Sequence, residues 1–202
     1  MTGKRITIWP LVCFVILLCS CPTRKVFTTN YYYQNEKVLT SIEQSYKTLF
    51  QHKHFSVAFT DRSFNYISLE ILTDSIKYIY EFDIRENKLH DTLVKYNFPA
   101  PQVINLVMQM RSIQCSWIHN LDYYANNQKQ TMVFMSIRHI SFHLPFTSEK
   151  YYILTFYSQP QYYDSEGRLL ASRRLRKLRK INDDIFHRIN DKVCYTVSER
   201  FR

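Results

Sequence analysis

Glycine is nearly absent from this chain, and its absence restricts both the turns and the chemistry that the chain can form. Only Gly3 and Gly167 are glycines among 202 residues. Phosphate-binding loops, dinucleotide-binding fingerprints and the nucleophile elbows of hydrolases each need several glycines in a short span, so these sites are excluded. Tight turns must come from asparagine, aspartate and serine, as at residues 73–75 and 125–127.

The first 21 residues have the layout of an export signal. Lys4 and Arg5 precede an apolar run over residues 6–18, which leads into Leu18-Cys19-Ser20-Cys21. A charged start, a short apolar region and small residues at a cleavage point are typical of signal peptides. A membrane-spanning helix needs about 20 apolar residues, and this run is shorter and contains Pro10.

The end of this segment resembles the lipobox of bacterial lipoproteins. Leu18 matches the −3 position, Ser20 the small residue at −1, and Cys21 the thiol that is acylated before cleavage, whereas Cys19 departs from the usual −2 residues. The resemblance implies a signal peptide over residues 1–20 and a lipid-modified (palmitate-type) Cys21. Several acyl chains hold a protein firmly at a membrane. A plain secreted protein and an uncleaved anchor are the alternatives.

The start of the mature chain indicates where the protein is sent. No aspartate follows Cys21, and residues 21–25 contain no acidic cluster. In enteric bacteria an aspartate at that position retains lipoproteins at the inner membrane, so we expect the outer membrane, facing the periplasm. Loss of Lys4 and Arg5 lowers the formal charge from +10 to about +8. The partners expected for an exported basic protein are envelope proteins, anionic lipids or acidic glycans, not nucleic acid.

Two cysteines remain after Cys21. Cys115 and Cys194 are an even pair, and an oxidising compartment permits a disulfide between them. The alternative is two separately buried thiols, and the sequence does not decide between these readings.

Hydrophobic spacing predicts a tether at residues 21–33, followed by a single α+β domain over residues 34–202. The domain is expected to be a mainly antiparallel sheet with about three helices, in the order α-βββ-α-βββ-α-β. Helices are predicted over residues 34–51, 101–113 and 165–190. Strands are predicted over residues 55–59, 64–72, 76–84, 115–123, 131–144, 150–158 and 192–201. Residues 89–96 could form a further strand, and the strand at 131–144 is apolar on both faces, as a central strand would be.

The densest charged segment lies within the third predicted helix. Its seven basic residues lie opposite a leucine and isoleucine stripe, and they are Arg168, Arg173, Arg174, Arg176, Lys177, Arg179 and Lys180. A basic amphipathic helix can lie on an anionic surface, which makes these residues a candidate patch for an anionic partner. The alternative is the solvated outer face of a packed helix, partly neutralised by Asp183 and Asp184.

No constellation of residues indicates catalysis, a metal or a cofactor. The pairs His139/His143 and Cys115/His119 are four residues apart on predicted strands, about 13 Å, which is too far for one metal ion or for a thiol–imidazole pair. His52 and His54 have no nearby ligand partner. Paired tyrosines at 31–33, 123–124, 151–152 and 162–163 could bind a partner or fill the core.

We therefore expect a lipid-anchored, non-enzymatic binding or assembly factor of the cell envelope. The helix-then-strands order resembles that of small envelope assembly lipoproteins and of protein inhibitors of secreted enzymes. The alternatives are a periplasmic inhibitor or immunity lipoprotein, and a small envelope hydrolase with dispersed catalytic residues. A cleft with converging titratable groups would favour the enzyme, and an exposed aromatic or charged surface would favour binding.

Overall fold

The computed structural model describes residues 24–125, 128–138, 151–159, 162–163, 169–170 and 186–198. These residues contain three helices and an eight-stranded sheet in which every pairing is antiparallel, so the predicted α+β class is confirmed. The helices are α2 (Arg24–His52), α3 (Asn87–Lys95) and α4 (Ala100–Ser112). The strands of the large sheet are β1 (Phe55–Phe59), β2 (Tyr66–Leu72), β3 (Lys77–Asp83), β4 (Cys115–Ala125), β5 (Gln128–Arg138), β6 (Tyr151–Tyr157), β9 (His187–Arg188) and β10 (Val193–Ser198).

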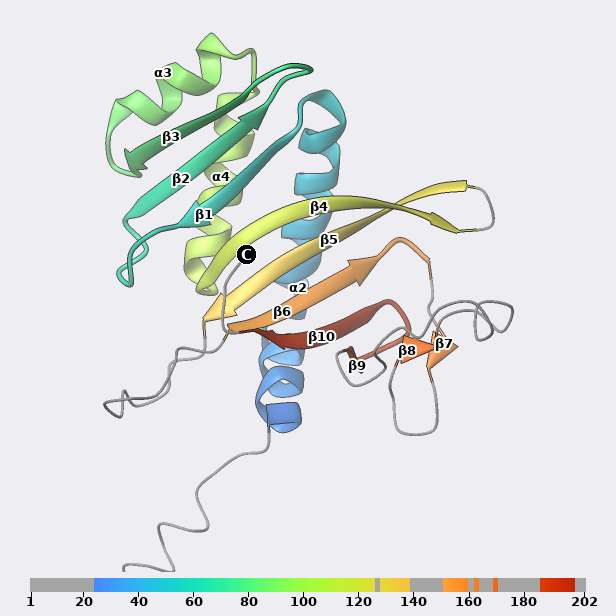
Figure 1. The fold of residues 1–202 in the computed structure, drawn as a ribbon. Helices are drawn as coiled ribbons and strands as arrows, with labels where there is room; N and C mark the ends of the chain where they lie inside the picture. The colour runs from blue at the N-terminus through green and yellow to red at the C-terminus, as the bar shows by residue number, and fades with distance from the viewer. Residues whose placement is uncertain are drawn as a thin grey trace, which may run out of the picture.

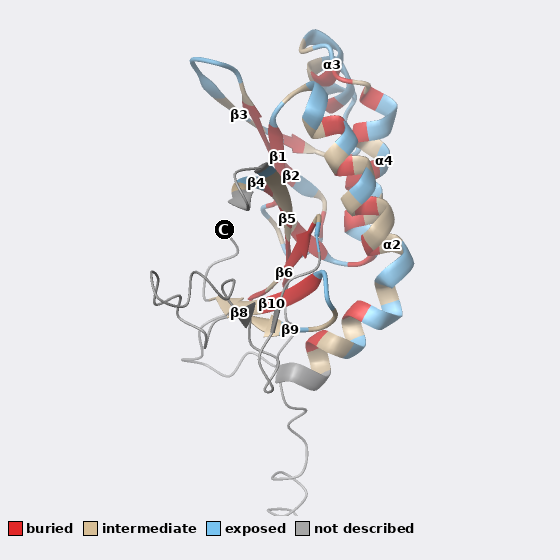
Figure 2. Cartoon of the chain, turned by 90° about the vertical axis from the view of Figure 1, so that its right-hand side faces the viewer, coloured by how far each residue is buried: buried red, intermediate tan, exposed pale blue. Residues whose placement is uncertain are grey.

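The sheet has the strand order β3-β2-β1-β4-β5-β6-β10-β9, and β7 (Tyr162–Tyr163) pairs with β8 (Leu169–Leu170) in a separate two-stranded sheet. Helices α2, α3 and α4 all lie on one side of the large sheet (Figures 1 and 2). We call this side the helix face and the opposite side the outer face. The core lies between the helices and the helix face, where the buried residues form one continuous cluster.

Helix α2 is long because its apolar residues recur at helical spacing over its whole length. Tyr32, Leu39, Ile42, Tyr46 and Leu49 are all buried against the sheet or α4. A fully buried side chain of this size contributes about 1.5–3 kcal/mol relative to an exposed one, so this stripe fixes the helix on the sheet.

The helix begins ten residues earlier than predicted. Residues 24–33, assigned from the sequence to the tether, are part of α2. Two ring contacts hold this first part on the sheet: Phe27 lies 5.2 Å from Tyr152, and Tyr32 lies 6.3 Å from Phe156, between ring centroids. The tyrosine run at 31–33 is thus divided between the core and solvent, since Tyr32 is buried and Tyr33 is 55% exposed.

Strands β1, β2 and β3 form the meander that alternation predicted. Asp61 organises the β1–β2 loop, because its carboxylate accepts hydrogen bonds from the backbone N–H groups of Ser63, Asn65 and Tyr66 at 3.1, 2.9 and 2.8 Å. Phe64 in this loop has a positive φ of 55°. The β2–β3 pairing is regular from Tyr66 opposite Asp83 to Leu72 opposite Lys77, which confirms the predicted hairpin.

Residues 87–95 form helix α3, so the strand considered at 89–96 is wrong. Leu89 and Leu93 are one helical turn apart and both are buried, and α3 packs against α4 and β3. Pro101 lies in the first turn of α4, where a missing N–H breaks no helical hydrogen bond. The predicted second helix is therefore confirmed.

The predicted helix over residues 165–190 is wrong where the structure describes it. Leu169–Leu170 form β8, and His187–Arg188 form β9 beside β10. A turn at Asn190 connects β9 to β10, because the Asn190 side-chain oxygen accepts from the N–H groups of Lys192 and Val193 at 2.9 and 2.8 Å. Strand β5 is central, between β4 and β6, as its apolar residues on both faces predicted.

Candidate binding surface

The outer face of the sheet carries large apolar and aromatic side chains. The three described helices lie on the other side of the sheet (Figure 2). Alternation along the strands separates these side chains from the core residues, and they come from β4, β5 and β6. We call this set the outer patch, and it consists of Trp117, His119, Leu121, Tyr123, Met132, Phe134, Ile153 and Tyr157. Leu121 is 47% exposed, Tyr157 is buried, and the other members are half-buried.

Strand register brings the members of the outer patch together. His119 lies opposite Phe134, and Leu121 lies opposite Met132, which in turn lies opposite Tyr157. Trp117 and His119 stack with ring centroids 5.6 Å apart and planes at 14°. Side chains opposite one another on neighbouring strands are close enough to contact, so the patch forms one continuous surface.

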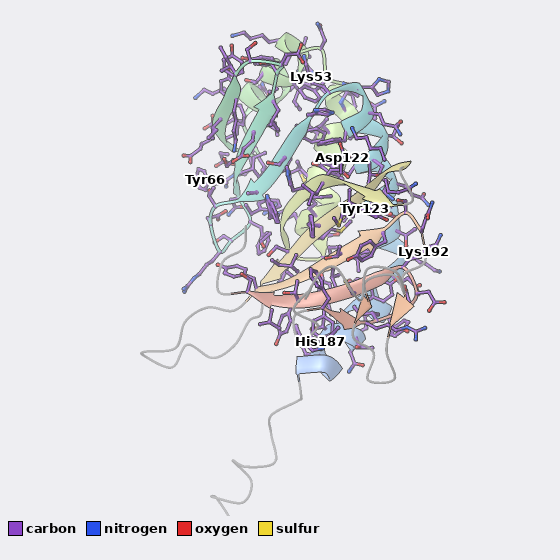
Figure 3. All side chains as sticks on the ribbon, turned by 45° about the vertical axis from the view of Figure 1, so that its right-hand side comes forward. Lys53, Tyr66, Asp122, Tyr123, His187 and Lys192 are labelled. Carbon is purple, nitrogen blue, oxygen red and sulfur yellow. The ribbon has the colours of Figure 1, made fainter. Side chains whose placement is uncertain are left out.

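A bulge in β4 sets which side chains reach the outer patch. The pairing with β5 shifts between Cys115 and Trp117. Cys115 therefore lies in the core with Ile118, and Trp117 and His119 lie on the outer face. Tyr123 extends the patch along β4 (Figure 3). Its ring contacts that of Tyr157 on β6 edge-on, with centroids 6.0 Å apart.

A polar group adjoins the outer patch on β1, β2 and β3. The Ser56 hydroxyl donates to the Glu70 carboxylate at 3.2 Å, and Lys77 forms an ion pair with the same carboxylate at 2.7 Å. The pairing of β1 with β4 ends at Val57 and Ile118, which are the chain neighbours of Ser56 and His119. Burial lowers the pKa of His119, the charge on Glu70 opposes this shift, and the charge on Lys77 adds to it.

Ser56, Glu70 and His119 are not connected as the residues of a serine hydrolase triad are. In a triad the histidine accepts the serine proton and the acid orients the histidine. Here the carboxylate of Glu70 accepts from Ser56 directly and also binds Lys77, and His119 Nδ1 is buried without a hydrogen bond. The arrangement holds the buried Glu70 carboxylate in place beside the outer patch.

Open grooves are lined by residues of the described helices and of the segments next to them. One, of about 560 Å³, lies where α2 meets β6 and the β9–β10 turn, and its lining includes Tyr32, Glu43 and Lys192 (Lys192 is labelled in Figure 3). Two of its lining residues are hydrogen-bonded, because the Asn190 side-chain amide donates to the Tyr32 hydroxyl at 3.0 Å. Another, of about 470 Å³, lies between α2 and the start of α4, and Gln44, His52 and Gln102 contribute to its lining.

Cys115 and Cys194 are free, buried thiols, so the disulfide considered from the sequence is not formed. They lie three strands apart, on β4 and β10, which is about 14 Å at the usual strand spacing. They also lie on opposite sides of the sheet, since Cys115 is in the core cluster and Cys194 lies opposite Thr155 on the outer side. Burial raises the pKa of each thiol to about 12.

The other sequence-predicted site residues lie outside the described residues. These are Cys21, the seven basic residues from Arg168 to Lys180, the aspartates at 183 and 184, and the histidines at 139 and 143. Of the described histidines, His52 and His54 are exposed near the end of α2. Within the part of the chain that is described, no group of three or more His, Cys, Asp or Glu side chains is placed to hold a metal ion.

The outer patch was not identified from the sequence. The signal that could have found it is the alternation of Trp117, His119, Leu121 and Tyr123, which places four large side chains on one face of a single strand. Among the described helices, none is both long enough and apolar enough to cross a membrane. Comparisons with protein-family models, with curated proteins and with solved structures found no match.

Proposed function

We propose that this chain is a lipid-anchored cell-envelope protein that binds another envelope protein through its outer patch and performs no catalysis itself. The observation that carries the proposal is the outer patch, a continuous aromatic and apolar surface on the sheet face opposite the helices. Rigid aromatic side chains bury large areas at little entropic cost, and for this reason they dominate protein interfaces.

The N-terminal sequence supplies the location in this proposal. The lipobox-like segment Leu18-Cys19-Ser20-Cys21 supports a lipid anchor at Cys21, and the residues after it support the outer membrane facing the periplasm. An anchored protein needs little affinity for the membrane from its folded domain, so its surface is available for a partner. A periplasmic inhibitor or immunity protein would be one form of such a binding factor.

Photo-crosslinking at matched positions tests the proposal. A photoreactive amino acid at Leu121, on the outer face, is compared with one at Met108, on α4; these side chains are 47% and 40% exposed. We expect a discrete protein adduct from position 121 in intact cells and none from position 108. The substitution Met132→Glu, opposite Leu121, should weaken the adduct about ten-fold, equivalent to about 1.4 kcal/mol. An adduct that forms only from position 108, or from neither position, contradicts the proposal.

A further inference from the structure

Strand β3 is the last strand at one edge of the sheet, and half of its backbone groups point away from β2. The bonds from Ile84 N to Asn65 O (2.9 Å) and from Thr73 N to Ile76 O (3.0 Å) fix which residues are hydrogen-bonded to β2. Bonded pairs alternate along an antiparallel ladder, so they include Tyr78, Tyr80 and Phe82.

The intervening residues of β3 present their backbone to the open edge. The N–H and C=O groups of Lys77, Ile79 and Glu81 point out of the sheet, and no backbone group within the described ranges bonds to them. Natural edge strands are usually short, bulged, interrupted by proline or charged, and of these features β3 has charged side chains, at Lys77 and Glu81. The opposite edge strand, β9, has only two residues, whereas β3 pairs over seven residues without a bulge.

The outer-face side chains of β3 form a regular charge pattern. Lys77, Ile79 and Glu81 are all exposed and occupy every second position, which gives the order cation, apolar, anion along the edge. Ile79 is 58% exposed, and Glu81 has no ion-pair partner among the described residues. Oppositely charged residues across from one another on paired strands are stabilising and like charges are destabilising. The edge therefore discriminates between incoming strands by charge.

Aromatic side chains on the helix face of β3 hold this strand in an extended shape. The rings of Tyr78, Tyr80 and Phe82 stack along the strand with centroids 6.4 and 6.0 Å apart, and the Tyr80 and Tyr96 hydroxyls are hydrogen-bonded at 2.5 Å. A partner strand would meet an edge that is already extended, so little ordering would oppose binding.

We propose that β3 binds an extended segment of a second envelope protein, which joins the sheet as a further antiparallel strand. Backbone hydrogen bonds to Lys77, Ile79 and Glu81 would supply the affinity. An acidic residue opposite Lys77, an apolar residue opposite Ile79 and a basic residue opposite Glu81 would supply the selectivity. The inference rests on the proposed binding function and adds the chemistry of the segment that is bound.

A second copy of this chain also carries the complementary pattern, but the direction of α2 argues against it as the partner. Antiparallel pairing of two β3 strands has its two-fold axis perpendicular to the sheet. Helix α2 begins at the end of the molecule far from β3 (Figure 1), so the two N-terminal ends would point in opposite directions. Two chains anchored in one membrane could not pair in this way.

Two capped nonapeptides test the inference with the purified chain in detergent. The peptide TTKTVTETT places lysine, valine and glutamate opposite Glu81, Ile79 and Lys77, and its isomer TTETVTKTT places like charges there. We expect the first peptide to bind about ten-fold more tightly, since the isomer replaces two attractive cross-strand charge pairs by two repulsive ones. Binding should slow hydrogen exchange at the amides of Ile79 and Glu81. Equal binding of the two peptides, or no binding at millimolar concentration, would overturn the inference.

A proline at position 79 tests the role of the backbone, because it removes an N–H group that an added strand would bind. The Ile79 N–H makes no bond within the sheet, so Ile79→Pro should leave the thermal midpoint nearly unchanged and weaken peptide binding at least about ten-fold. Ile79→Thr keeps the N–H and should bind within about three-fold of wild type. Undiminished binding by a folded Ile79→Pro protein overturns the inference, as does wild-type dimerisation that this proline abolishes. If wild type does not bind the peptide but the crosslink at Leu121 still forms, the edge-strand inference is wrong and the proposed function is not contradicted.

Discussion

The hydroxyl of Tyr46, on α2, donates a hydrogen bond of 2.5 Å to the backbone carbonyl of Phe55 on β1. The same hydroxyl accepts from the backbone N–H of Asn120 on β4. Direct pairing of β1 with β4 is limited to Val57–Ile118 and Ala58–Trp117, so the phenol connects the two strands where their own pairing has ended. One buried side chain thereby links the β1–β3 meander to the rest of the sheet.

Removing this hydroxyl should destabilise the protein without changing its fold. Tyr46→Phe leaves a strand carbonyl and a strand N–H without a partner in a site that is fully buried. An unsatisfied buried polar group costs about 1–3 kcal/mol, so we expect the free energy of unfolding to fall by about 2 kcal/mol or more. Urea unfolding measures this change. The control is Tyr33→Phe on the exposed side of α2, which should change the free energy by less than about 0.5 kcal/mol.

The two thiols should be unreactive in the folded protein. Burial raises the pKa of Cys115 and of Cys194 to about 12, and the thiolate is the reactive form. We expect neither thiol to be alkylated at pH 8 until urea is added, and reducing agent to leave the thermal midpoint unchanged. Rapid alkylation without denaturant, or a mass two hydrogens lower than that of the dithiol, would contradict this prediction.

The raised pKa values of the two thiols also predict how the free energy of unfolding changes with pH. The unfolded thiols ionise near pH 9, whereas the folded thiols remain protonated up to about pH 12. Their contribution to stability is therefore complete below pH 9 and is lost as the pH rises towards 12. Comparing the unfolding free energy at pH 8 and pH 10 for wild type and Cys115→Ala isolates one thiol, and the variant should lose less stability over this interval.

Local sequence patterns correctly predicted the elements that have one apolar side and one polar side. The hairpin of β2 and β3 follows from alternation on either side of an Asp74–Ser75 turn, and α4 follows from Pro101 together with a one-sided apolar stripe. Helix α3 was missed because only Leu89 and Leu93 mark its buried side. Two apolar residues four apart fit a strand face as well as a helix face.

The helix predicted over residues 165–190 was wrong for a different reason. Leucine and isoleucine at helical spacing suggested one helix through residue 190, but Asn190 and the following Asp191 form the turn that allows β9 to pair with β10. That pairing is tertiary, and it overrides the local pattern. The outer patch was missed for a similar reason. Strands that are apolar on both faces do not reveal which face meets the helices.

His119 should make the protein sensitive to mild acid. Burial lowers its pKa below the usual value of about 6.5, so the unfolded state takes up a proton more readily than the folded state. Its contribution to stability is present above pH 6.5 and is lost as the pH falls towards the lowered pKa. We expect the difference in unfolding free energy between pH 7 and pH 5 to be smaller in His119→Gln than in wild type. An equal difference in His119→Gln and in wild type would contradict the assignment.

The anchor can be tested independently of the folded domain. If Cys21 is the acylated thiol, Cys21→Ala should stop both acylation and cleavage, since the modified cysteine is what the lipoprotein signal peptidase recognises. Mass spectrometry should then find the unprocessed chain without lipid, whereas wild type should begin at Cys21 and carry acyl chains. The matched control is Cys19→Ala, which restores a usual residue at the −2 position and should mature as wild type does. Normal maturation of Cys21→Ala together with a lipid-free wild type would refute the lipoprotein assignment. It would leave the outer patch and the β3 edge unaffected, because neither depends on residues before α2.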